Sequence, residues 1–137
     1  MVEMAIILPI LLLVMFAIAE MGLLFNRWLT LSNAAREGAR HAIVYRDNCV
    51  AGIVKTEITN RVLDFAEAGA IQRNDVAVAF SNNEIADNVC AGSGTQVLVR
   101  ASIDFPFLYI PGLGALRSPG ILPGSLNVGH SAVMRNE

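Results

Sequence analysis

An apolar run near the start of the chain constrains the fold most. Residues 4–25 read MAIILPILLLVMFAIAEMGLLF, with Glu20 as the one charged residue. As an α-helix this run extends roughly 33 Å, which matches a bilayer hydrocarbon core of about 30 Å. A cleaved signal peptide usually has a shorter apolar region preceded by Lys or Arg, and the residues before Met4 contain neither. We therefore predict a membrane-spanning helical segment, residues 1–28, joined to a soluble domain, residues 29–137.

Three residues interrupt this apolar helix in ways that suggest contacts with other helices. A carboxylate in hydrocarbon is normally paired, led to water or protonated. Glu3 either lies among lipid headgroups at the positive end of the helix dipole, or pairs with the α-amino group of its own or a neighbouring chain. Glu20 is expected to make a polar contact with an adjacent helix or to lie near the outer interface. Pro9 bends or loosens the helix by removing one backbone hydrogen bond. We predict an assembly role for these three residues.

The helical pattern continues beyond the membrane edge to about Tyr45. Small residues recur there at helical spacing and allow close approach of another element; they are Ala34, Ala35, Gly38, Ala39 and Ala42. Two interpretations are open. The soluble domain rests on this face, or neighbouring helices of an assembly contact it.

Charge and cysteine content narrow the class of protein. Ten basic and twelve acidic residues give a formal net charge of -2 without a Lys/Arg tract, so we expect no nucleic-acid partner. We prefer a disulfide between Cys49 and Cys90, formed in an oxidising compartment, to two free thiols. The basic residues that follow the span would instead place this side in the cytoplasm. The conflict disappears if a basic leader once preceded Met1, and we therefore expect a processed N-terminus at or near that residue.

Beyond the long helix the pattern predicts a small α+β domain. Residues 50–70 predict a second helix ending at Gly69, with one apolar face packed on a sheet; this face comprises Val50, Ile53, Val54, Ile58, Val62 and Phe65. Residues 75–80, 95–105 and 125–135 are the strand candidates, and the second alternates apolar and polar residues. Because no helix is available as a crossover between the last two strands, we expect an antiparallel sheet.

Two loops and the few candidate catalytic residues complete the prediction. Asn82, Glu84 and Asp87 could offer oxygen ligands to Ca²⁺, but their spacing matches no calcium loop, so an ordinary turn region is preferred. The proline-rich stretch 106–124 either folds over the sheet or forms an exposed contact surface. His130 is expected to be a solvated strand residue. No phosphate loop, metal-ligand repeat or nucleophile with a base is evident, so we predict neither a cofactor nor enzymatic activity.

Both ends of the sequence carry a resemblance. The segment VEMAIILPILLLVMFAIAEMGLLFNRWLTLSNAAREGARHA resembles the N-terminal signature of the TadE-like pilins of the Tad (tight adherence) branch of type IV pili. It has the Val-Glu-x-Ala start, the early Pro, the mid-helix Glu and the Ala-Ala-Arg-x-Gly-Ala-Arg tail. Near the other end, VLVRASIDFPFLYIPGLG and SAVMRNE resemble the family's strand, aromatic and Pro segment and its closing residues. The resemblance therefore implies a pilin-like fold.

The resemblance also implies how the chain is processed and assembled. Type IV pilin precursors are cut by an inner-membrane prepilin peptidase, and the mature subunits reach an extracellular filament through an assembly platform. The assembly Glu is usually the fifth mature residue but here is the third, which leaves open whether two residues precede Met1 or Met1 is a translational start. By resemblance Glu3 meets a neighbouring subunit's N-terminal amine. We expect a shaft or minor subunit of an adhesive pilus; the alternative is a monomeric single-pass envelope protein whose extracytoplasmic domain binds a partner or ligand.

Overall fold

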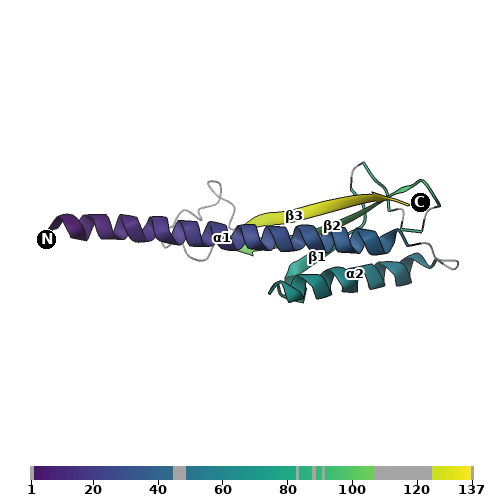
Figure 1. The fold of residues 1–137 in the computed structure, drawn as a ribbon, viewed down its shortest axis with the longest axis horizontal. Helices are drawn as coiled ribbons and strands as arrows, with labels where there is room; N and C mark the ends of the chain where they lie inside the picture. The colour runs from purple at the N-terminus through teal and green to yellow at the C-terminus, as the bar shows by residue number, and fades with distance from the viewer. Residues whose placement is uncertain are drawn as a thin grey trace. The chain divides into compact units, whose positions relative to one another are not determined.

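Over the residues that it describes, a computed structural model shows an α+β fold with two α-helices and a three-stranded antiparallel sheet (Figure 1). The structure describes residues 2–44, 49–82, 84–87, 89, 90, 92–106 and 125–136. The elements follow in the order α1 (Val2–Ala42), α2 (Ala51–Ala68), the short 3₁₀ helix η1 (Arg73–Asp75), β1 (Val76–Ala79), β2 (Gln96–Pro106) and β3 (Ser125–Arg135). The fold class predicted from the sequence is confirmed.

The sheet has the order β1-β2-β3, so β2 is the central strand. β1 pairs antiparallel with β2, with Val76 opposite Ile103 and Ala79 opposite Arg100. The backbone amide of Asn136 donates to Thr95 O over 2.9 Å, and Asn127 Nδ2 donates to Asp104 Oδ1 over 2.8 Å. The start of β2 therefore meets the end of β3, as antiparallel pairing requires.

The chain divides into two compact units, residues 1–26 with 104–127 and residues 27–103 with 128–137. The first compact unit contains the apolar part of α1 and the adjoining ends of β2 and β3. Residues 107–124 of the proline-rich stretch lie outside the described residues, so both interpretations of that stretch remain predictions.

The second compact unit holds the main core, built between α1, α2 and the sheet. Its α1 residues face α2 and β2 through small side chains. A Cβ placed on Gly38 would lie 2.5 Å from Val62 Cγ2 and 3.2 Å from Val99 Cγ1. Apolar side chains less than 2 % exposed fill this region; the largest are Leu31, Ile58, Leu98, Ile103, Val62, Val97 and Val99.

Helix α2 runs antiparallel to α1. Gly69, which follows its last turn, abuts Thr30, whereas Arg61 Nε lies 3.7 Å from Glu37 Oε1. Movement toward the C-terminus of α2 thus corresponds to movement toward the N-terminus of α1. The backbone amide of Gly69 bonds to the carbonyls of Phe65 and Ala66, and the helix ends there as the sequence predicts.

The buried face of α2 differs from the predicted one. The structure buries Val54, Ile58, Val62 and Ala66. It leaves Val50, Ile53 and Phe65 exposed, with Ile53 at 60% and Phe65 at 43%. Including these three in the core was wrong, because α2 contacts its neighbours through a single i, i+4 row and the wider apolar arc falls outside this contact.

Candidate functional site

The first candidate site is the apolar surface of α1. Its large hydrophobic side chains are exposed along most of residues 4–25; they are Met4, Ile6, Ile7, Leu8, Ile10, Leu11, Leu12, Leu13, Val14, Met15, Ile18, Met21, Leu23 and Phe25. A contiguous apolar surface of this size is not stable in water and marks a membrane or protein interface. Helix α1 is long and apolar enough to cross a membrane, in agreement with the predicted membrane helix.

The three predicted assembly residues have different surroundings in α1. Pro9 lies inside the helix, which continues on both sides of it. Glu20 is only 2% exposed, although Met21 beside it is 61% exposed. The backbone of Glu3 is helical, and its side chain lies outside the described side chains. Among the described side chains, Pro9 and Glu20 are eleven residues apart along α1 and do not meet, and the assembly role of all three residues stays a prediction.

The five small residues of α1 are all buried within the chain. They lie in the second compact unit, where the absence of long side chains lets α1 approach α2 and β2 closely. Val62, Val99 and Ile58 all lie within 3.4 Å of the position that a Gly38 Cβ would take. The structure thus uses this face inside the chain, as the first of the two interpretations proposed.

A covalent bond and an ion pair join the start of α2 to the loop between β1 and β2. Cys49 and Cys90, 41 residues apart in sequence, form a disulfide, and the described residues contain no free cysteine. Lys55 Nζ pairs with Asp87 Oδ2 near the same junction. These two links tie the loop to the start of α2.

A contact between α1 and β3 was not predicted from the sequence. The rings of Trp28 and His130 meet edge to face, with centroids 6.0 Å apart and planes at 85°. His130 is accordingly half-buried and is not the freely solvated strand residue that was predicted. Alternation in residues 125–135 places His130 on the same face as Val128 and Ala132, which are buried. This pattern was the one sequence signal that could have indicated that His130 is partly buried.

Replacing His130 with alanine should uncover one edge of the Trp28 ring. We expect a loss of about 1 kcal/mol in the free energy of unfolding, typical of an aromatic pair, and increased quenching of Trp28 fluorescence by acrylamide. Trp28 is the chain's one tryptophan, so the signal is unambiguous. Ser131→Ala on exposed, neighbouring Ser131 is the matched control. Equal quenching in the two variants would show that His130 does not shield the ring.

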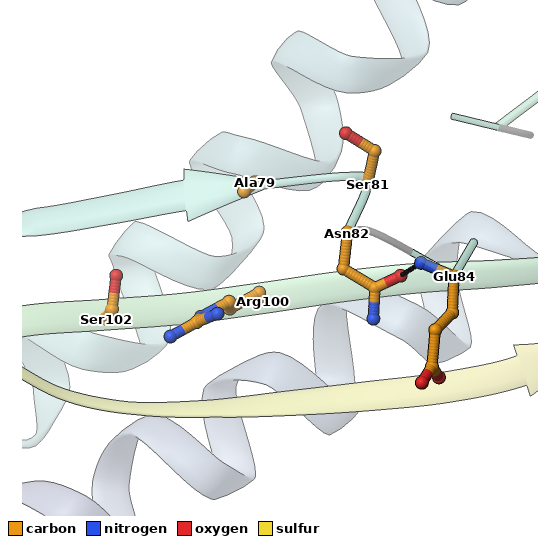
Figure 2. A pocket seen from close by; sticks show the side chains of 6 residues that line it. All are labelled: Ala79, Ser81, Asn82, Glu84, Arg100 and Ser102. Carbon is orange, nitrogen blue, oxygen red and sulfur yellow. Dashed lines mark hydrogen bonds between the residues drawn. The ribbon is translucent and has the colours of Figure 1, made fainter. Parts of the chain in front are cut away.

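The described residues also surround a shallow hollow of about 590 Å³ (Figure 2). Small side chains and Arg100 form the strand side, and the loop after β1 forms the rim; the lining residues are Ala79, Ser81, Asn82, Glu84, Arg100 and Ser102. Asn82 Oδ1 accepts hydrogen bonds from the backbone amides of Glu84 and Ile85 at 2.9 and 2.6 Å. Asn82 thus closes a turn, and Asp87 pairs with Lys55. These contacts agree with an ordinary turn region, which was the interpretation preferred to a Ca²⁺ site.

Comparison with known proteins adds one match to this geometry. Residues 1–40 match the family described as TadE-like protein, and this range covers nearly all of α1. No curated protein and no solved structure matches the chain. The match includes the exposed apolar surface, Glu3, Pro9, Glu20 and four of the five buried small residues, the exception being Ala42. Over residues 1–40 the chain is similar to the TadE-like family.

Proposed function

We propose that this chain is a pilin subunit, in the shaft or at low copy number, of a Tad-like type IV pilus. Residues 1–28 would anchor it in the inner membrane with residues 29–137 on the extracytoplasmic side, until it enters an extracellular filament for surface attachment. One observation carries the proposal: the family match coincides with a helix that is exposed and apolar in its first part and packed against a folded domain in its second.

The exposed part of α1 suits transfer from lipid to a filament core. In the membrane its side chains would contact acyl chains, and in the filament they would contact the equivalent helices of neighbouring copies. Any surface previously in contact with water would contribute about 25 cal/mol per Å² on burial. Repetition of one heterologous contact that does not close into a ring builds a filament.

Glu3 and Pro9 would direct this transfer, and Glu20 would contribute a polar contact with an adjacent helix. Glu3 would pair with the N-terminal amine of a neighbour, because an isolated carboxylate is costly away from water. Pro9 would loosen α1 for packing among other helices. The implied partners are other pilin subunits, a prepilin peptidase and the assembly platform. The proposed role is structural and includes neither catalysis nor nucleic-acid binding.

Replacing Glu3 with alanine should abolish the filament form while leaving the protein in the membrane. The measurement is fractionation of sheared surface material with electron microscopy, comparing native protein and Glu3→Ala at equal membrane abundance. Glu84→Ala is the control, because Glu84 is an exposed acid in the second compact unit. Native protein and the control should appear in thin filaments, and Glu3→Ala should not.

Two results would contradict this proposal. Filaments of Glu3→Ala in native amount would remove the assembly role of Glu3. If the native protein never leaves the membrane fraction, the pilin function fails as a whole. The single-pass envelope protein with a partner-binding extracytoplasmic domain would then be the better account.

A further inference from the structure

Helix α1 carries an exposed polar stripe on the side opposite its buried small residues. Leu29, Asn33, Arg36 and Arg40 follow one another at intervals of three or four residues and are all exposed. Within the part of the chain that the structure describes, no hydrogen bond or ion pair holds Arg36 or Arg40. The folded domain therefore accounts for the small residues of the TadE-like segment but not for Arg36 and Arg40, whereas Arg27 of the same segment has a partner within the chain.

We propose that this stripe contacts helix α2 of a second copy of the chain while both copies are in the membrane. The proposal rests on the part of the proposed function that inserts many copies into one bilayer. It adds a specific contact between soluble regions, distinct from packing of the apolar helices.

The exposed side of α2 offers complementary charge. Glu57 and Asp64 are exposed there at helical spacing. Glu57 also has a partner within its own chain, and Asp64 shares Arg73 with Glu67. Three carboxylates thus lie near this surface with Arg61 and Arg73 as the neighbouring cations, and Arg61 itself faces Glu37. Phe65 adds an exposed apolar ring that the core does not use. The surface resembles the rim of a protein contact more than a fully solvated helix face.

A common membrane brings these charges to matching heights. Copies of one chain inserted with the same orientation hold equivalent residues at equal heights. Within one copy Arg61 is level with Glu37, and Gly38 lies between Ile58 and Val62. Because the helices are antiparallel, Arg40 is then within one residue of the level of Glu57, and Arg36 within two residues of Asp64. At 1.5 Å per residue both offsets are no more than about 3 Å, which long side chains can bridge.

Lipid headgroups are a less suitable partner for this stripe. Arg36 comes eleven residues after Phe25, the end of the apolar run. Along a helix this is roughly 16 Å, whereas the headgroup layer on each side of the bilayer is only about 6 Å thick. A protein surface at the same height reaches Arg36 and Arg40 more readily than lipid does.

Photo-crosslinking in the membrane tests the contact directly. A photoreactive residue replaces Asn33 in the full chain, and isotopically labelled and unlabelled copies are mixed in one membrane so that crosslinks between copies are identified by mass. We expect crosslinks to residues 51–68 of a second copy. The same residue at Ser131, on the exposed side of β3, is the control and should give none to α2.

Charge reversal then tests the pairing. Arg40→Glu alone and Glu57→Arg alone should each reduce the crosslink yield about three- to fivefold, because each replaces an attraction by a repulsion between exposed charges. The two substitutions together should restore it, since residue 40 of one copy again meets opposite charge at residue 57 of another. Trp28 fluorescence checks that each variant is folded.

Three outcomes would overturn the inference: crosslinks only to lipid, no crosslink between copies, or a yield that charge reversal leaves unchanged. Filament yield is scored separately. Loss of filaments with the crosslink intact would count against the pilin function alone, whereas filaments without the crosslink would count against this contact alone.

Discussion

Replacing Cys49 and Cys90 with serine should lower the free energy of unfolding of the second compact unit by about 3–4 kcal/mol. The disulfide joins residues 41 positions apart, and opening it returns that loop's conformational freedom to the unfolded chain. It also fixes a loop that carries Val89, which is buried at 5% exposure. A loss of this size should lower the unfolding temperature by more than about 10 °C.

Thermal unfolding of the full chain in detergent micelles, followed by Trp28 fluorescence, is the appropriate measurement. Asp87→Ala is the control, because it removes the ion pair with Lys55 at the same junction and leaves the covalent bond intact. Both partners are about a third exposed, so this variant should lose less than about 1 kcal/mol. Native protein treated with a reductant should behave like the double serine variant. Similar stability of the double variant and Asp87→Ala would refute the expected contribution of the disulfide.

Replacing Gly38 with valine should destabilise the second compact unit by about 2–3 kcal/mol through overpacking. The added Cβ alone would lie 2.5 Å from Val62 Cγ2, and two further methyl groups must be accommodated beside it. Val99 and Ile58 close the remaining sides at 3.2 and 3.4 Å, so α1 has to move away from α2 and β2. The better helix propensity of valine offsets only a few tenths of a kcal/mol of this loss.

Gly52→Val is the matched control for Gly38→Val. It adds the same atoms to a helix of the same unit, but a Cβ at Gly52 meets nothing within 4 Å. Its unfolding free energy should change by less than about 0.5 kcal/mol. Chemical denaturation of the full chain in micelles gives both values. If the two variants lose equal stability, the close approach of α1 to α2 and β2 does not limit the packing.

Local patterns predicted most of the fold because each depends on residues close together in sequence. The continuous apolar run predicted the first part of α1, and the alternation of Val97, Val99, Ala101 and Ile103 predicted a strand with one buried face. Gly69 predicted the end of α2. The strand candidates at 75–80 and 125–135 contain β1 and β3, and the candidate at 95–105 covers β2 except for its last residue, Pro106.

Local sequence patterns predicted the candidate site only in part. Residues 2–42 and two segments near the C-terminus carried the TadE-like resemblance, and the family match covers residues 1–40. The Trp28–His130 contact joins residues far apart in the chain, so the local alternation could place His130 on the face of Val128 and Ala132 but could not identify Trp28 as its partner. The statements about the proline-rich stretch and about the side chain of Glu3 stay predictions, because residues 107–124 and that side chain lie outside what the structure describes.

Periodicity and hydropathy were enough to predict a helix apolar enough for a membrane and a small α+β domain after it, because these signals act over a few turns or a single strand. Only the tertiary structure decided which apolar side chains enter the core. α1 approaches α2 closely at Gly38, and this contact selects Ile58 and Val62 while leaving Ile53 and Phe65 outside. Packing geometry made that choice, because both sets of residues are equally hydrophobic and helix contact is narrower than the apolar arc.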